Sequence, residues 1–134
     1  MAPAAQVDLQ AALVDHQRWA DRLHRYGLGD RSHPLDADFV CQTDHCALGH
    51  WLRAHTNWAA AHATDLQQLT DEHAAFHLKA AVVITLVQTG AVESALQSVQ
   101  YGDFARVSAR LMLHLHALRD ALASDSASGE RGWN

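Results

Sequence analysis

Three histidines and one cysteine in this chain are side chains of the kinds that bind zinc. His73 and His77 lie four residues apart, so on a helix both would project from one face at adjacent turns. His16 and Cys46 lie far from that pair along the chain. Neutral imidazole and thiolate are ligands that tetrahedral zinc prefers, and these four residues would fill every coordination position. We therefore predict a fully ligated zinc site, which favours a structural or sensory role over hydrolysis.

Each of these residues taken alone has a simpler interpretation. The chain contains 11 histidines, so about one pair at this spacing is expected by chance. Alone, His16 would be interpreted as a hydrogen-bonded core histidine, and Cys46 as a small buried apolar residue. Their combination favours a metal, because several polar side chains at core positions destabilise a fold unless one partner satisfies them together.

The first predicted helix carries His16. Over residues 9–23, apolar side chains recur at steps of three and four, which is typical of an amphipathic helix with His16 on its buried face. Gly27 and Gly29 are placed to end this helix. Residues 30–34 then form a predicted loop, because the residue before a proline disfavours the helical region.

Two further helices would bring the other candidate ligands to the same interior. A short helix is expected to start near residues 43–44, where threonine or aspartate can cap its N-terminus, so that Cys46 falls in its first turn. A long helix is predicted over residues 62–87, where apolar side chains alternate at steps of four and three. The histidine pair lies in and beside that apolar stripe. Gly90 is placed to end the helix.

The remaining apolar stripe predicts one more long helix, from residue 92 to about residue 122, with a possible break at residues 102–103. No segment shows convincing strand alternation. These elements predict an all-α fold, an antiparallel four-helix bundle with an additional short helix that carries the cysteine ligand. We expect a single domain over residues 1–134, with a core at about residues 7–123 and a polar, flexible tail over residues 124–134.

Composition and charge exclude several classes of partner. The net charge is −5 and Lys79 is the only lysine, so no basic stripe for nucleic acid can be assembled. No stretch is long and apolar enough to span a bilayer, and the N-terminus lacks the pattern of a secretory signal. We therefore expect a cytoplasmic location. The scarcity of lysine beside abundant alanine and arginine suggests a bacterial genome rich in G and C.

The metal-binding pattern resembles the chemoreceptor zinc-binding (CZB) family. That family has a histidine followed three residues later by an aromatic residue, as in His16 and Trp19. It then has Cys-x-apolar-Gly-x-aromatic, as in residues 46–51, and His-x-x-x-His, as in residues 73–77. The resemblance covers residues 7–122, and its most specific part is the cysteine motif. It implies the zinc ligands His16, Cys46, His73 and His77.

The cysteine motif itself has a physical interpretation. Gly49 lacks a β-carbon, which would let the short helix approach its neighbour closely, while Leu48 and Trp51 would pack into the core. Cys46, near a helix N-terminus and beside a dication, should be a thiolate. Its oxidation would weaken one zinc ligand. Zinc occupancy and cysteine oxidation are therefore both candidate signals.

The resemblance implies a regulatory domain rather than an enzyme. Domains of the family occur on chemoreceptors and diguanylate cyclases and often pair as homodimers, which connects them with chemotaxis and with cyclic di-GMP regulation. The 134 residues are too few for a sensor plus an output module, so we expect signalling to a partner protein in trans and, by the resemblance, a homodimer. The sequence also shows no phosphate-binding loop, nucleophile elbow or paired carboxylates that would indicate an enzyme.

Two alternatives remain open at this point. The first is a structural zinc in an interaction adaptor, or a zinc buffer, because the ligands would be the same. The second is a hemerythrin-like di-iron bundle, which needs bridging carboxylates on the core faces, whereas Glu93 and Asp120 are poorly placed.

The sequence does not decide which groups orient the ligand imidazoles from behind. The candidates are the aspartates Asp15, Asp44 and Asp65, and the histidines His62 and His114.

Overall fold

The computed structural model describes residues 2–32, 35–40, 48, 49, 51 and 59–131. The helices within these ranges are α1 (Ala2–Gly27), α2 (Ala37–Val40), α4 (Ala59–Gln88), α5 (Val92–Gln100) and α6 (Asp103–Arg131). No strand occurs in the described ranges. The predicted all-α bundle is confirmed. Cys46 and the start of its predicted short helix lie outside the described residues.

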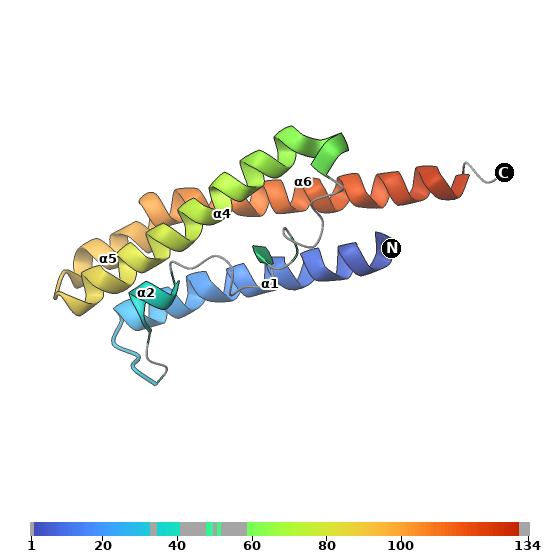
Figure 1. Ribbon diagram of the computed structural model, residues 1–134. Helices are drawn as coiled ribbons and strands as arrows, with labels where there is room; N and C mark the ends of the chain where they lie inside the picture. Colours follow the sequence, from blue (N-terminus) through green and yellow to red (C-terminus); the bar gives the residue numbers. More distant parts are fainter. Residues whose placement is uncertain (1, 33–34, 41–47, 50, 52–58, 132–134) are drawn as a thin grey trace.

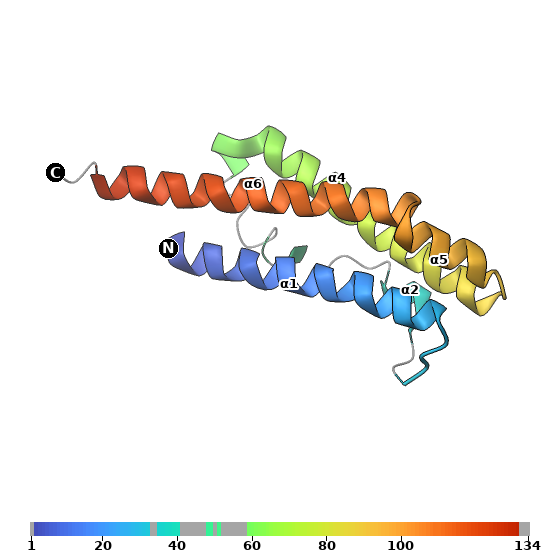
Figure 2. The same cartoon turned by 180° about the vertical axis from the view of Figure 1, so that it is seen from behind.

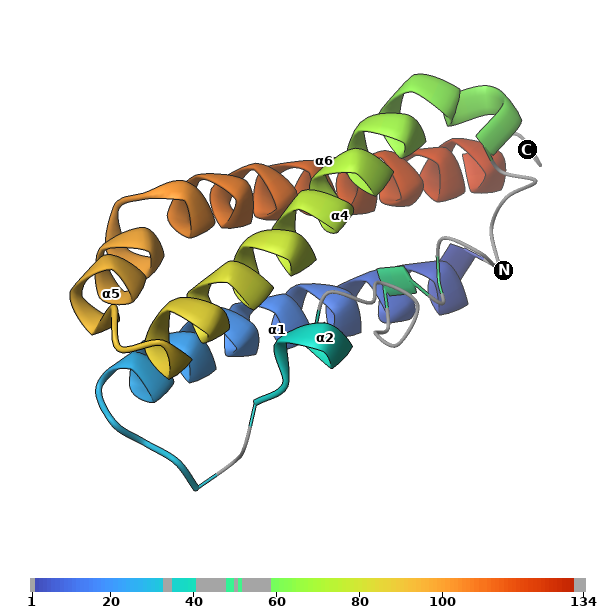
Figure 3. The ribbon, with the colours of Figure 1, turned by 60° about the vertical axis from the view of Figure 1, so that its left-hand side comes forward.

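The long helices lie side by side along one axis (Figure 1). Helices α1 and α4 run in the same direction, and α5 and α6 return along them, so that the start of α1 and the end of α6 lie at one end of the bundle (Figures 1 and 2). Helix α6 packs against α4 and α1, and α5 packs against the same two helices. The short helix α2 packs against α4 (Figure 3). This arrangement places the middle of α1 beside the middle of α4.

Glycines end two of the helices as predicted. Gly29 and Gly90 have φ angles of +113° and +92°, the left-handed conformation that glycine adopts without a steric penalty. The Asp30 amide donates to the Arg25 carbonyl at 3.0 Å, and the Ala91 amide donates to the Leu86 carbonyl at 2.7 Å. Both turns therefore satisfy carbonyls that a helix end would otherwise leave unpaired.

Gly27 has a different role from Gly29, because it marks a close approach between α1 and α5. A β-carbon on Gly27 would lie 2.7 Å from Cδ2 of Leu96.

The predicted break in the last helix is also confirmed, since α5 ends at Gln100 and α6 begins at Asp103. Helix α6 then continues past residue 122, where the apolar stripe ends, to Arg131. That stretch contains no proline to stop it.

Helix α2 was not predicted from the sequence. Asp36 caps it, because its carboxylate accepts a hydrogen bond from the Asp38 amide at 3.0 Å. The Val40 amide donates to the Asp36 carbonyl at 2.9 Å. Leu35 and Val40, at either end of the segment, are both buried. The segment is held by this burial as well as by its cap, and four residues give too weak a local pattern to recognise.

The core runs along the bundle between α1, α4 and α6. Its largest fully buried apolar side chains come from all three helices and from the cysteine motif: Leu13, Leu23, Leu48, Leu69, Phe76, Ile84, Phe104, Leu111 and Leu115. Among the residues whose side chains are described, three polar ones are buried within this apolar core, with exposed fractions of 0%, 2% and 4%: His16, His73 and His77. None of the helices, as far as they are described, is long and apolar enough to cross a membrane.

Candidate metal centre

Helices α1 and α4 bring three of the predicted ligands together. The ring centroids of His73 and His77, one turn apart on α4, lie 4.5 Å from each other. The ring of His16, on α1, lies 5.3 Å from His73 and 5.6 Å from His77. One ligand nitrogen from each ring can be chosen so that all three lie within 4.8 Å of one another. Residues 57 positions apart in the sequence thus share one small volume.

The cluster favours neutral imidazoles. Burial, followed by the charges of the neighbouring His77 and His16, lowers the pKa of His73 from its usual 6.5 to about 3. Burial also lowers the pKa of His16 and of His77, although backbone hydrogen bonds and the carboxylate of Asp15 oppose that shift. Neutral imidazole is the form that binds metals. At neutral pH each ring of the cluster therefore has one unprotonated nitrogen that can bind a metal.

His16 is oriented by its own helix. Its Nδ1 lies 2.7 Å from the carbonyl oxygen of Ala12, one turn earlier in α1. A carbonyl only accepts hydrogen bonds, so Nδ1 must carry the proton and donate it. The other nitrogen, Nε2, then has a lone pair; it is fully buried and has no hydrogen-bond partner in the described part of the chain. A buried lone pair without a partner is what a metal ion would satisfy.

His77 is oriented in the same sense but by a different element. Its Nδ1 lies 2.8 Å from the carbonyl oxygen of Val40, the last residue of α2. Nδ1 is again the donor, and Nε2 is again buried with no hydrogen-bond partner among the residues the structure describes. The sequence had suggested aspartates for this orienting role. Backbone carbonyls orient both rings instead, and Asp15 contributes only its charge.

These donors fit zinc. Histidine nitrogens bind zinc at about 2.0–2.1 Å, which separates two tetrahedral ligands by about 3.3 Å. The nitrogens of the cluster can reach that separation by small side-chain movements, since they already lie within 4.8 Å. The fourth predicted ligand, Cys46, lies outside the described residues. Three residues of its motif, Leu48, Gly49 and Trp51, are buried, as their sequence pattern predicted.

Aromatic side chains enclose the cluster on one side. Phe76 packs edge-on against His16 and His77, with ring centroids 4.9 Å and 5.6 Å away. Phe104 of α6 lies behind Phe76 at 5.1 Å. These rings exclude water, which strengthens electrostatic interactions between a metal and its ligands.

A second polar contact ties α4 to α6 beside the cluster. The Nδ1 atom of His114 contacts the Glu72 carboxylate, and Glu72 precedes His73 in the chain. His114, one of the two histidines proposed as supporting groups, therefore pairs with Glu72 rather than with a ring of the cluster. The side chain of the other, His62, lies outside the described part, as do Asp44 and the side chain of Asp65.

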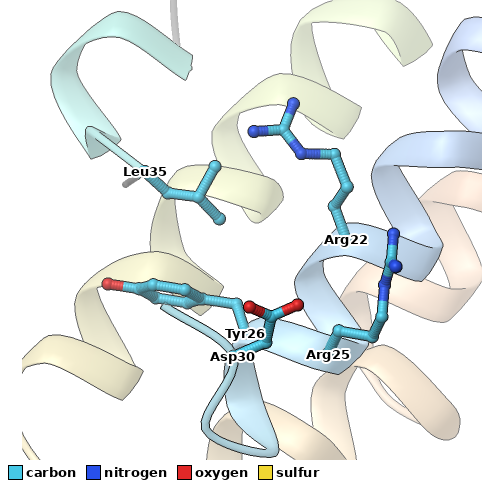
Figure 4. Close-up of a pocket in the computed structure, with 5 residues that line it drawn as sticks. All are labelled: Arg22, Arg25, Tyr26, Asp30 and Leu35. Atoms are coloured by element: carbon cyan, nitrogen blue, oxygen red, sulfur yellow. The ribbon is translucent and has the colours of Figure 1, made fainter. Parts of the chain in front are cut away.

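A pocket near the end of α1 is unrelated to the cluster (Figure 4). It is lined by Arg22, Arg25, Tyr26, Asp30 and Leu35. Its volume is about 20 Å³, close to what a single water molecule needs. Both charge signs line it, and a metabolite would not fit. This pocket therefore does not compete with the histidine cluster as a candidate site.

Comparison with known families agrees with this geometry. The model of the chemoreceptor zinc-binding domain matches residues 16–84, just over half of the chain. The matched range begins at His16 and includes the cysteine motif and the histidine pair. Searches of curated proteins and of solved structures found no match. The resemblance seen in the sequence is thus confirmed at the level of the family.

Proposed function

The chain belongs to the chemoreceptor zinc-binding domain family, and on that basis we propose that it is a non-catalytic regulatory protein that reports its zinc state to a partner. The proposed ligands are His16, Cys46, His73 and His77. The observation that supports this best is the pair of buried Nε2 atoms on His16 and His77, each opposite an Nδ1 fixed as a donor. Because both rings present a buried, unprotonated Nε2, they indicate one shared metal ion.

Bound zinc would cross-link α1, α4 and the segment between them. The histidine ligands come from α1 and α4, and the proposed cysteine ligand comes from the segment between them. Zinc that binds only the folded chain stabilises it by mass action. Loss of zinc, or oxidation of Cys46, would remove that link and loosen the packing of α1 on α4. This change in packing is the signal that we propose.

The output is proposed to act in trans through exposed surfaces of the bundle. Leu78 and Val82 on α4, and Tyr101 between α5 and α6, are large apolar side chains with exposed fractions of 56%, 42% and 75%. Such residues support an interface with a second copy of the chain and with a signalling partner. A chemotaxis receptor or a cyclic di-GMP enzyme is the proposed kind of partner. The proposed setting is the cytoplasm of a bacterium, where a cysteine ligand stays reduced.

A structural zinc in an adaptor, or a zinc buffer, is the alternative. Complete burial of the three histidines is compatible with either role. A hemerythrin-like centre has less support, because the two acidic residues considered for a bridge, Glu93 and Asp120, are exposed. We propose that all 134 residues form one domain, with its core over about residues 7–123.

Metal content and zinc affinity of the purified chain test the proposal. We expect one zinc per chain in the wild type and a large loss of affinity in Cys46→Ala and His77→Ala. His116→Ala, which changes an exposed histidine of α6, is the matched control and should bind like the wild type. Affinity near the free zinc level of a cell indicates a zinc sensor. Tighter zinc that oxidant releases indicates a cysteine switch, and tighter zinc that oxidant leaves bound indicates the structural alternative. Two irons or no metal would contradict the assignment.

A further inference from the structure

Helix α4 holds the segment over residues 35–40 at two points. The Gln88 side-chain amide donates a hydrogen bond to the carbonyl of Leu35 at 3.1 Å. The Nδ1 of His77 donates to the carbonyl of Val40 at 2.8 Å. Gln88 and His77 are 11 residues apart, close to three full turns, so they lie on the same face of α4. One face of α4 therefore holds the segment at both of its ends.

The hydrogen bond from His77 to Val40 decides which ring nitrogen of His77 can bind a metal. A neutral imidazole carries one proton, on either Nδ1 or Nε2, and the hydrogen bond made by one nitrogen decides which. While the Val40 carbonyl faces Nδ1, the proton stays there and Nε2 keeps the lone pair that a metal needs. If Val40 moved away, the proton could occupy Nε2 and block that position.

Helix α2 is too short to keep Val40 in place alone. It has four residues, and isolated helices of that length are not stable. Beyond the burial of Leu35 and Val40 and the Asp36 cap, Gln88 supplies an anchor at its beginning. The same Gln88 amide also donates to the hydroxyl of Tyr26 at 3.3 Å, so the anchor includes the end of α1. The pair of contacts made by Gln88 fixes where the segment starts on α4.

We propose that Gln88 is a positioning residue of the metal site, which acts through residues 35–40 to hold His77 with its proton on Nδ1 and its lone pair on Nε2. The inference rests on the proposed role of His77 as a zinc ligand. It assigns a function to a residue three turns away from the cluster, outside the family's metal motif. Gln88 itself is exposed, so its substitution should leave the core packing intact.

The test uses the full chain without metal, labelled with ¹⁵N at histidine, and nuclear magnetic resonance to measure which ring nitrogen carries the proton. Gln88→Leu removes the donor, and Gln88→Lys keeps a donor of similar reach. We expect Gln88→Leu to shift His77 toward the tautomer protonated on Nε2, and Gln88→Lys to restore the wild-type tautomer. His16 is the internal control, because its Ala12 partner belongs to its own helix.

Zinc titration of the same three proteins completes the test. Losing one hydrogen bond of ordinary strength predicts an affinity about three- to tenfold weaker for Gln88→Leu, and close to the wild type for Gln88→Lys. An unchanged His77 tautomer in Gln88→Leu would overturn the proposal, as would a changed tautomer with unchanged zinc affinity. A shift of His16 and His77 together would also overturn it, since that indicates general loosening. If the wild type binds no zinc, the proposed function fails, whereas the tautomer result stands separately.

Discussion

His16 and His77 face the same small volume, yet different parts of the molecule orient them. The partner of His16 is the carbonyl of Ala12, four residues earlier in the same helix. The partner of His77 is the carbonyl of Val40, 37 residues away on another element. The orientation of His16 is therefore available as soon as α1 forms, whereas that of His77 requires α2 to dock on α4. One half of the cluster depends on local structure and the other half on tertiary structure.

Removing the imidazole of His16 or of His77 should have the largest effect on zinc affinity, and the two losses should be of similar size. His16→Ala and His77→Ala each delete one proposed ligand, so zinc affinity should fall by more than about 100-fold in both. Competition with a chelator measures this. His24→Ala, which changes a histidine of α1 outside the cluster, should bind normally. Retention of tight zinc binding by either cluster variant would show that its ring is not a ligand.

Acid should have the next largest effect on the metal-free chain. The pKa of His73 is lowered to about 3 and those of His16 and His77 are also lowered, whereas the unfolded chain titrates near 6.5. Below pH 6.5 the unfolded state therefore binds more protons than the folded state. The free energy of unfolding should fall by about 1.4 kcal/mol per pH unit for each histidine that stays neutral.

Denaturant titrations between pH 7.5 and pH 4 measure this loss, which should continue toward pH 3 for His73. A variant with His73→Leu lacks one of the titrating groups and should show a shallower slope. Equal slopes for the two proteins would show that His73 is not held neutral in the folded chain.

Weakening α2 should change the orientation of His77 and leave that of His16 unchanged. Asp36→Ala removes the cap of α2, a change of about 1 kcal/mol in the stability of a helix end. Zinc affinity should fall up to about fivefold, because Val40 and hence His77 lose their fixed position. The His77 tautomer should change and the His16 tautomer should not. Asp120→Ala, an exposed substitution on α6, is the control, and equal changes at both rings would contradict the distinction.

Breaking the contact between Glu72 and His114 should have the smallest effect. The pair is partly exposed, with side-chain exposed fractions of 20% and 33%, so solvent screens much of its interaction. Glu72→Gln should lower the free energy of unfolding by less than about 1 kcal/mol. Zinc affinity should stay within about twofold. A larger loss of affinity would show that Glu72 positions its neighbour His73.

The parts of the structure that depend on local sequence were predictable. Apolar spacing located the long helices, and Gly29 and Gly90 end α1 and α4 where a left-handed residue is required. The break before Asp103 was predicted from its glycine. The three histidines could be assigned to one interior because each lies on or beside an apolar stripe.

What the sequence did not reveal is what depends on tertiary contacts. Helix α2 is short, and its docking through Leu35 and Val40 has no periodic signal. The groups that orient His16 and His77 are backbone carbonyls, which every residue possesses, so no residue type could indicate them. A sequence can indicate only side-chain partners such as aspartates. Helix α6 continues to Arg131, beyond the last apolar residue of its stripe, so its end has no signal in the apolar pattern.

Burial of the cluster has a kinetic consequence. With exposed fractions of 4% or less, the three histidines are out of reach of a competing chelator while the bundle stays closed. Zinc held there would leave only when the protein opens, so its release rate should reach a plateau as chelator concentration rises. Such a site retains its ion after the surrounding concentration has fallen. The protein would then record an earlier exposure to zinc rather than the level at that moment.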